Sequence, residues 1–439
     1  MDRANRTVAF AFLALCMVAV ICNIRLVRAS GPIYIRADGT VEPIGAPIQR
    51  NGDVYILTDN VTSQADGIII EKSSITFDGS GYTVQGGAGG NGFYLYGISN
   101  VTIRNVRTEG FNYGIYLEST SRNVISRNDM RASTYDGIGL YDAANNSVSS
   151  NSMRENGWSG IGLYFSMGNN LSANYISNNY YGMNCFSSQE NWIFHNNFVA
   201  NTNQTSSDGL PNAWDNGYPS GGNYWSDYAG SDTYSGVHQN ETGSDGIGDT
   251  PYDCAESNQD RYPLMQVFTN IAVQRVLPSK SIVGQGYNVT IEVRVENQGW
   301  EPKTTNITFH VNTTVIATYT NLAMTGRNQT ILNAIWQTAT YTKGNYTTRI
   351  VADTVSGETD ITDNNCTWMI HVGVPGDVSG STQGVYDGIV NMRDIQYMIL
   401  LFNAKPGSTN WNPNADVNND LVVNMRDINI AIMNFNKHE

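Results

Sequence analysis

The sequence of 439 residues has few charged residues, and the basic ones are the scarcer kind. Lysine and arginine together number 25, against 39 aspartates and glutamates, which gives a formal net charge of −14. Nucleic acid and anionic membrane surfaces repel a polyanion of this kind, so neither is an expected partner. An excess of carboxylate oxygens suits hard cations such as calcium instead.

Proline is also scarce, with 12 residues, whereas glycine numbers 43 and hydrophobic residues make up 40% of the chain. That share of apolar side chains excludes a disordered polypeptide and can build β-rich cores. The chain is too long for one ordinary core, so we expect two or three domains.

Cysteine is rare as well, with five residues, of which two fall before residue 30. The other three, Cys185, Cys254 and Cys366, are odd in number and widely spaced. This spacing excludes a disulfide framework and a clustered metal site built from cysteines.

The longest apolar run lies at residues 8–24, behind Arg3 and Arg6 and ahead of the small residue Ala29. This pattern predicts an export signal over residues 1–29, and therefore a secreted or cell-surface protein. An uncleaved membrane anchor is the alternative, and only then would the chain meet a membrane. Twelve Asn-x-Ser/Thr sites fit a glycosylated, exported protein. Their asparagines are Asn60, Asn100, Asn145, Asn170, Asn203, Asn240, Asn288, Asn306, Asn312, Asn328, Asn345 and Asn365.

A repeat of 22 to 23 residues runs from about residue 68 to residue 204. In each unit a glycine precedes a short alternation of inward apolar and outward residues, which is typical of a strand. The glycines are Gly92, Gly114, Gly137, Gly160 and Gly182. A second strand follows, with Val124, Val148, Leu171 or Ile193, then Asn128, Asn151, Asn174 or Asn196, then Met130, Met153, Ile176 or Phe198.

One unit is too small to bury its own apolar face, so the units must stack coaxially. The repeat therefore predicts a right-handed parallel β-helix over residues 30–204, with about six turns. We expect its recurring asparagines at corners, in left-handed backbone, with their amides bonded to the turns above and below. An aromatic and Gly/Asp-rich segment at 205–268 is expected to cap the open end, through Trp214, Tyr224, Trp225, Tyr228 and Tyr262.

The units "GIYLESTSRNVISRNDM" and "GIGLYDAANNSVSSNSM" resemble the β-helix repeats of NosD-like proteins. That resemblance implies either periplasmic copper binding or the carbohydrate binding and sugar hydrolysis found on the same repeats. Copper needs His, Met or Cys gathered together. The five histidines are scattered, and Cys185 takes the place of a core leucine, so the residues give copper little support.

Outward residues of the repeat predict a sugar-binding face. Tyr116, Tyr141, Tyr164 and Phe186 are the expected stacking residues, and the last three fall at one register. The carboxylates Glu118, Asp136, Asp142 and Glu155 are candidate catalytic groups, with Arg122, Arg127 and Arg131 available to neutralise a uronate. The alternative is that these side chains only solvate and stabilise a sheet. We favour binding over catalysis. In the cap, Asp245 and Asp249 either hold calcium or bond turn amides.

Residues 269–373 show long alternating strands, which predict an immunoglobulin-like β-sandwich. The strings "VTIEVRVENQG" and "YTTRIVAD" resemble the cell-adhesion-related bacterial domain CARDB. This resemblance implies a role in adhesion or in spacing the neighbouring domains apart.

In residues 374–439 the hexapeptide beginning at Val390 recurs at Val423. The second copy completes a loop whose oxygens are spaced to surround calcium, at Asp416, Asn418, Asp420, Val422 (main-chain carbonyl), Asn424 and Asp427. The first copy offers Asp377, Ser379, Asp387, Ile389 (main-chain carbonyl), Asn391 and Asp394, with extra residues before Asp387. Apolar residues then recur at helical spacing: Ile395, Met398, Ile399 and Phe402, and again Ile428, Ala431, Ile432 and Phe435.

A doubled calcium loop followed by a single helix resembles a dockerin, which implies calcium as the bound ion and a cohesin-like protein as the partner. Leu421 stands where the sharp turn favours glycine, which predicts a reduced affinity.

We therefore predict a mostly β protein with a small α-helical module at its C-terminal end. Its expected function is to bind a polysaccharide or surface glycan and to dock through calcium. The alternatives are a polysaccharide lyase, hydrolase or epimerase on the same β-helix and, second, a copper-binding protein of the NosD type.

Overall fold

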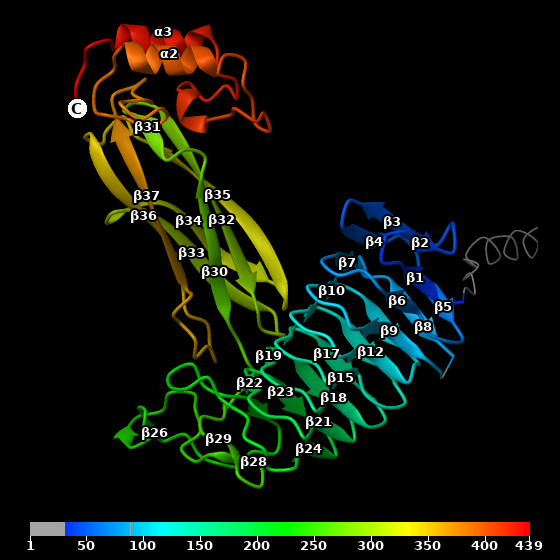
Figure 1. The fold of residues 1–439 in the computed structure, drawn as a ribbon. Helices are drawn as coiled ribbons and strands as arrows, with labels where there is room; N and C mark the ends of the chain where they lie inside the picture. Colours follow the sequence, from blue (N-terminus) through cyan, green and yellow to red (C-terminus); the bar gives the residue numbers. More distant parts are fainter. Residues whose placement is uncertain (1–30, 88) are drawn as a thin grey trace, which may run out of the picture. The chain divides into compact units, whose positions relative to one another are not determined.

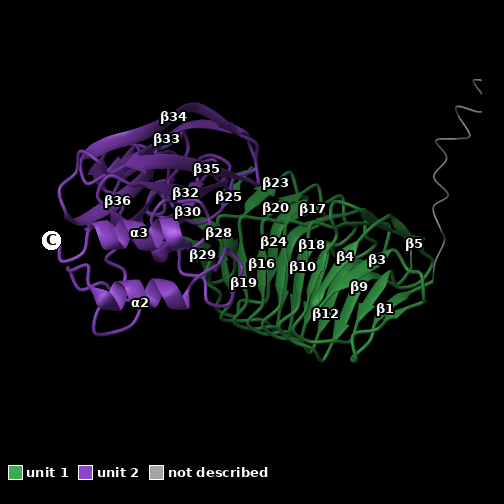
Figure 2. Cartoon of the chain, turned by 90° about the horizontal axis from the view of Figure 1, so that it is seen from above, with its two compact units in different colours: residues 1–215, 225–228, 251–261 green, residues 216–224, 229–250, 262–439 purple. Residues whose placement is uncertain are grey.

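The computed structural model describes residues 31–87 and 89–439, so the predicted export signal or anchor lies outside the described residues. The fold is mostly β (Figure 1). Two compact units divide the chain (Figure 2). The first contains residues up to 215, 225–228 and 251–261, and the second contains 216–224, 229–250 and 262–439. None of the described helices combines the length and apolar character that crossing a membrane requires.

The first unit is a parallel β-solenoid of about seven turns, which confirms the stacking of the repeats. One sheet contains β1 (Ile33–Ile35), β2 (Val41–Glu42), β6 (Ile68–Ile70), β9 (Asn91–Tyr96), β12 (Tyr113–Glu118), β15 (Ile138–Tyr141), β18 (Ser159–Tyr164), β21 (Tyr181–Phe186) and β24 (Asn203–Ser207). A second contains β3 (Ile48–Asn51), β4 (Val54–Leu57), β7 (Thr76–Asp78), β10 (Thr102–Arg104), β13 (Val124–Ser126), β16 (Ser147–Ser149), β19 (Asn170–Ser172) and β22 (Trp192–Phe194). The third contains β5 (Val61–Ser63), β8 (Thr83–Gly86), β11 (Arg107–Glu109), β14 (Asp129–Arg131), β17 (Ser152–Arg154), β20 (Tyr175–Ser177), β23 (Asn197–Val199) and Trp225 of β25 (Tyr224–Trp225).

Each regular turn therefore has three strands, not the two that the repeat predicted. The expected second strand is two short strands separated by a corner. Val124 was also assigned one residue out of register: it is 37% exposed, while Ile125 is buried and pairs with Val148. The strands are only three residues long here, so sequence alternation alone could not place the corner.

The corners are bridged by ladders of buried asparagines, as predicted. Asn128 donates its main-chain and side-chain N–H groups to Oδ1 of Asn151 at 3.0 and 3.1 Å, and Asn151 repeats both bonds to Asn174. The left-handed residue is the one before each asparagine, such as Arg127 and Ser150 with φ of 59° and 56°, and not the asparagine itself.

Two tryptophans close the apolar interior at the C-terminal end of this unit. Trp214 and Trp225 are about 1% exposed and join the β-helix core. Trp225 stacks on Phe198 and on Tyr252, with ring centroids 4.3 and 4.2 Å apart. Tyr252 belongs to the hairpin of β28 (Tyr252–Ala255) and β29 (Asn258–Asp260). Two other predicted cap residues, Tyr224 and Tyr262, belong to the second unit.

The second unit contains two larger sheets around one core. One sheet has β30 (Ile271–Pro278), β32 (Asn288–Asn297) and β35 (Asn328–Gln337), and the other has β31 (Ile282–Gly284), β37 (Asn365–Gly373), β36 (Gly344–Ala352), β33 (Lys303–Val311) and β34 (Thr314–Met324). A small ribbon joins β26 (Tyr234–Ser235) and β27 (Glu241–Thr242). Inward residues such as Ile291, Phe309 and Ile370 are fully buried. Trp368 of β37 lies outside this core and is 46% exposed.

Two short helices end the described chain, α2 (Met392–Leu400) and α3 (Met425–Met433), with a 3-10 turn η1 (Pro413–Ala415) between them. Asn391 and Asn424 cap them, and Asp394 and Asp427 complete capping boxes. Met398, Ile428 and Ala431 are buried as expected. The other periodic residues are not all buried: Ile399, Phe402, Ile432 and Phe435 are 41–56% exposed.

Candidate functional site: an aromatic cleft and a carboxylate cluster

A cleft of about 490 Å³ opens on the sheet that contains β12, β15 and β18. We call it the aromatic cleft, because aromatic side chains line it: Tyr113, Tyr116, Tyr135, Tyr141, Trp158 and Tyr164. The ring centroids of Tyr113 and Tyr116 are 4.7 Å apart, and those of Tyr141 and Tyr164 are 6.5 Å apart. The volume is ordinary for a small-molecule site.

Two glycines leave room for this cleft. Along the sheet, the outward position of Tyr116 pairs with Gly139, which pairs with Gly162. A Cβ at Gly139 would lie 2.9 Å from the ring of Tyr113, and one at Gly162 would lie 2.4 Å from Oδ2 of Asp136. Any side chain at either position would displace the groups that shape the cleft.

Asp136 lies fully buried beside the aromatic cleft. Its Oδ1 accepts from the main-chain N–H of Ser159 at 3.0 Å, and its Oδ2 accepts from the hydroxyl of Tyr164 at 3.1 Å. Burial raises the pKa of Asp136 to about 7, against the lowering effect of these hydrogen bonds. A carboxyl group with this pKa exchanges its proton near neutral pH.

The structure brings three of the four predicted stacking residues, Tyr116, Tyr141 and Tyr164, into the cleft. Phe186 pairs with Tyr164 in register but does not line the cleft; its ring contacts Phe165, with centroids 5.6 Å apart. Three further residues that line the cleft, Tyr113, Tyr135 and Trp158, were not predicted from the repeat. Each stands one or two residues before a repeat glycine, and that shared place was the available signal.

The four candidate catalytic carboxylates do not form one group. Glu118 accepts from the hydroxyl of Tyr94 at 2.8 Å, and Asp142 accepts from Oγ of Ser119 at 3.2 Å in an exposed turn. Glu155 is exposed at a corner with φ of 59°. Asp136 alone combines burial with a contact to a residue that lines the cleft.

The arginines proposed to neutralise a uronate lie away from the cleft-bearing sheet. Arg131 belongs to β14 of the third sheet, where it pairs with Glu109 at 2.8 Å. Arg122 and Arg127 occupy left-handed corners with φ of 57° and 59°. The six side chains that line the cleft include no cation.

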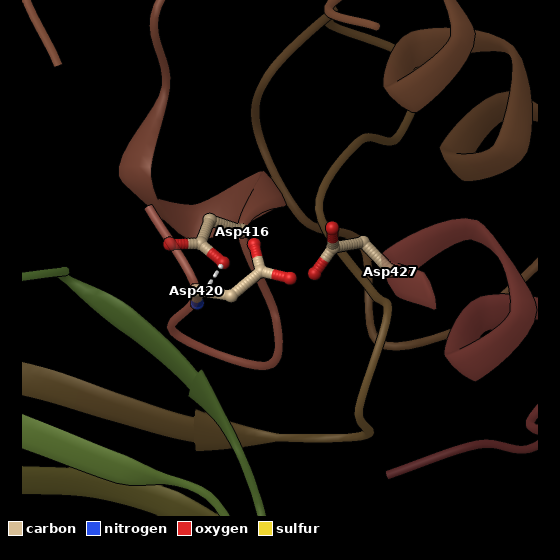
Figure 3. A group of neighbouring side chains, drawn as sticks. All are labelled: Asp416, Asp420 and Asp427. Atoms are coloured by element: carbon tan, nitrogen blue, oxygen red, sulfur yellow. Dashed lines mark hydrogen bonds between the residues drawn. The ribbon is translucent and has the colours of Figure 1, made fainter. Parts of the chain in front are cut away.

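A second candidate site lies in the second unit, where carboxylate oxygens of Asp416, Asp420 and Asp427 come within 4.8 Å of one another (Figure 3). Oδ1 of Asp416 accepts from the main-chain N–H of Asp420 at 3.1 Å. Burial, with Asp416 and Asp420 nearby, raises the pKa of Asp427 despite its main-chain hydrogen bonds. Oxygen donors in this arrangement suit a hard divalent cation.

The remaining predicted ligands of this loop surround the cluster. Asn418 and Asn424 each donate a side-chain N–H to Asp420, at 3.2 and 3.0 Å. The carbonyl of Val422 accepts from Asn424 at 3.1 Å. The buried Lys280 donates to the main-chain carbonyl of Asp416. Leu421 has φ of 64°, which agrees with the expectation that this position favours glycine.

The first loop repeats much of this geometry. Asp377 accepts from the main-chain N–H of Gly388 at 2.8 Å, as Asp416 does from Leu421 at 3.0 Å. Asp394 accepts from the main-chain N–H of Ser379, and the carbonyl of Ile389 accepts from Asn391. Burial and then nearby carboxylates raise the pKa of Asp377 to about 6. Among the described residues, Asp377, Asp387 and Asp394 do not meet as closely as the second-loop trio.

The cap aspartates have turn partners. Asp249 accepts from Thr233 and Tyr234 main-chain N–H groups at 3.0 Å, and Asp245 accepts from the N–H of Ile247 at 3.1 Å. These contacts are those expected of aspartates that bond turn amides, and calcium at Asp245 and Asp249 stays a prediction.

The first unit is thus a parallel β-helix with an aromatic cleft. Residues 33–230 match the family model described as periplasmic copper-binding protein (NosD), which confirms the resemblance of the repeats. No curated protein gives a significant match to the chain.

Three solved structures illustrate the similarities of the two units. The CARDB domain of a Pyrococcus furiosus protein, in complex with di-metal ions, is 22% identical over 24% of this chain and 89% of its own, with a TM-score of 0.22. The periplasmic alginate epimerase AlgG is 14% identical over 39% of this chain and 64% of its own, with a TM-score of 0.26. The Agl-KA catalytic domain is 16% identical over 37% of this chain and 36% of its own, with a TM-score of 0.24. These sequence identities and TM-scores are too low to assign the activity of any of these proteins to this chain.

Copper, which the family description names, does not fit the residues that the structure describes. Cys185 is 1% exposed within the β-helix core, and burial raises the pKa of its thiol to about 12. Within the described ranges, the grouping of His, Cys, Asp or Glu that could hold an ion consists of Asp416, Asp420 and Asp427. Copper prefers imidazole, thiolate or thioether ligands, and this grouping offers oxygen alone.

Proposed function

We propose that the protein is a non-cytoplasmic glycan-binding protein, either secreted or on the cell surface, that docks through calcium. The aromatic cleft carries the first part of this proposal. Its rings present apolar faces for stacking against sugar rings, and phenol hydroxyls can add hydrogen bonds. The predicted export signal and the periplasmic description of the matched family support the location.

A matched pair of variants on one sheet tests the glycan site. Tyr141 and Phe186 are similarly exposed, at 40% and 50%, but only Tyr141 lines the cleft. Titration calorimetry with a panel of oligosaccharides should give Tyr141→Ala about tenfold weaker binding, and Phe186→Ala an unchanged affinity. New reducing ends or unsaturated products would instead favour the lyase, hydrolase or epimerase alternative, above all if Asp136→Asn abolished them.

The calcium-dependent docking part rests on the carboxylate cluster and on a repeated apolar face. Ile399 and Ile432 occupy equivalent places in α2 and α3 and are 56% and 50% exposed. Phe402 and Phe435, also equivalent, are 43% and 41% exposed. A duplicated exposed apolar pair, held by loops suited to calcium, is a fitting surface for a cohesin-like partner.

The docking proposal is tested by capture on the immobilised full chain in calcium and in EDTA. The expected partner is a cohesin-like protein that binds in calcium only and is lost with Ile399→Glu or Ile432→Glu. Val315, 53% exposed in β34, provides the control variant Val315→Glu. Capture of the partner that is unchanged by EDTA and by Ile399→Glu or Ile432→Glu would contradict the docking proposal.

A further inference from the structure

Two carboxylates, those of Asp136 and Glu118, lie close enough to the aromatic cleft to act on its tyrosines. Burial raises the pKa of Tyr116 to about 12, and the carboxylates of Glu118 and Asp136 add to this shift. The pKa of Tyr113 is raised to about 12 by burial and then by Asp136. No basic residue contributes to either shift.

The six side chains that line the cleft include no cation, and three arginines of the neighbouring turns are paired on another sheet. Arg107 and Arg154 both contact Oδ2 of Asp129, at 2.9 and 3.0 Å, on the third sheet. Arg131 pairs with Glu109 on that sheet. An acidic sugar in the cleft would therefore meet carboxylates without a compensating cation.

Asp136 also orients the wall of the cleft. The hydroxyl of Tyr164 donates to Asp136 at 3.1 Å and lies 3.5 Å from the side-chain nitrogen of Asn184. Gly162 is needed for this contact, because its Cβ would lie 2.4 Å from Oδ2 of Asp136 and 2.6 Å from the ring of Tyr164. Asp136 is thus a positioning residue for Tyr164 and a source of negative charge beside the cleft.

We propose that the aromatic cleft selects neutral sugars and rejects uronates, with Asp136 and Glu118 supplying the repulsion. This inference rests on the proposed function and names its ligand class. Neutral rings stack on the tyrosines and Trp158 at no electrostatic cost, whereas a uronate brings a carboxylate into a negative field.

The test measures affinity of the full chain, at pH 8, for hexasaccharides of mannan, cellulose and laminarin, and for those of polygalacturonate and alginate. At least one neutral hexasaccharide should bind at least about tenfold more tightly than either uronate. Asp136→Asn should strengthen uronate binding about fivefold or more. Glu118→Gln should act in the same direction.

Glu155→Gln is the matched control, because this carboxylate is exposed at a corner away from the cleft. It should leave the ratio of neutral to uronate affinity unchanged. Uronates that bind as tightly as the neutral sugars, or a ratio that neither Asp136→Asn nor Glu118→Gln alters, would overturn the selectivity while leaving glycan binding intact. Failure of all five probes to bind would overturn the glycan-binding proposal itself and the selectivity with it.

Discussion

The β-helix and the C-terminal loops both bury polar side chains, but they satisfy them in opposite ways. In the β-helix, each amide of a ladder accepts from the turn before and donates to the turn after, as Asn151 does between Asn128 and Asn174. In the loops, the carboxylates of Asp416, Asp420 and Asp427 can only accept, and Arg426, 3.6 Å from Asp420, is an exposed partner that offsets part of their mutual repulsion. Amides therefore build a self-sufficient interior, whereas a cluster of carboxylates gains stability from any cation beside it.

The largest expected effect comes from placing a carboxylate in a ladder. Asn151→Asp loses the bonds donated to Ile125 and Asn174, at 2.8 and 3.1 Å, and points a charge at two acceptors. We expect a loss of about 4 kcal/mol or more in the free energy of unfolding, measured by urea denaturation. Asn145→Asp, an exposed corner residue of the same turn, should change it little. Equal effects of the two would contradict the role of the ladder.

Asp136→Asn should stabilise the β-helix in alkaline solution. The folded pKa of about 7 exceeds the ordinary 3.8, so the folded state binds more protons between these values. Stability therefore falls as the pH rises from about 4 to 7 and is level above. Asp136→Asn does not lose this stability. At pH 8 its free energy of unfolding should therefore exceed that of the unsubstituted protein by about 4 kcal/mol, and near pH 4 the two values should be equal. Denaturation curves at both pH values measure it, and a gain that is independent of pH would contradict the assignment.

Calcium should stabilise residues 374–439 without affecting the β-helix. At a concentration one hundred times the dissociation constant, the gain is about 2.7 kcal/mol. Scanning calorimetry of the full chain in calcium and in EDTA measures it for each transition. Asp420→Asn should lose most of the gain, since it removes a charge from the cluster. A profile unchanged by EDTA would count against calcium.

The smallest effect separates the two loops. Leu421 has φ of 64°, where the first loop has Gly388 with φ of 85°. A left-handed leucine costs about 1–2 kcal/mol, so Leu421→Gly should raise stability by about 1 kcal/mol and strengthen calcium binding. Calcium titration of this variant measures both changes. Leu400→Gly, in α2, is the comparison and should destabilise the protein. Weaker calcium binding by Leu421→Gly would show that this turn needs its leucine.

The repeat predicted the stacked strands and the ladders because both depend on one period, which is visible in the order of residues. It predicted three of the residues that line the aromatic cleft, Tyr116, Tyr141 and Tyr164, but missed Tyr113, Tyr135 and Trp158, which come from other columns of the sheet. Only the register between turns, with Gly139 and Gly162 leaving space, brings these rings together. The clustering of Asp416, Asp420 and Asp427 was predictable from their spacing because these residues are close together in the sequence. The exposure of Ile399 and Ile432 could not be predicted, because helical periodicity does not show which face of a helix packs against another element.

In an asparagine ladder each amide bonds to the next turn, so the amide of the last turn needs a partner from outside the repeat. Asn212 closes one ladder by accepting from Asn191 at 2.9 Å and meeting Asn258 of the terminal hairpin. Without that hairpin and the tryptophans beside it, the last turn would offer a ready template to the first turn of another molecule. End-to-end growth is thus the expected failure of this architecture, and the terminal hairpin covers the edge from which it would start.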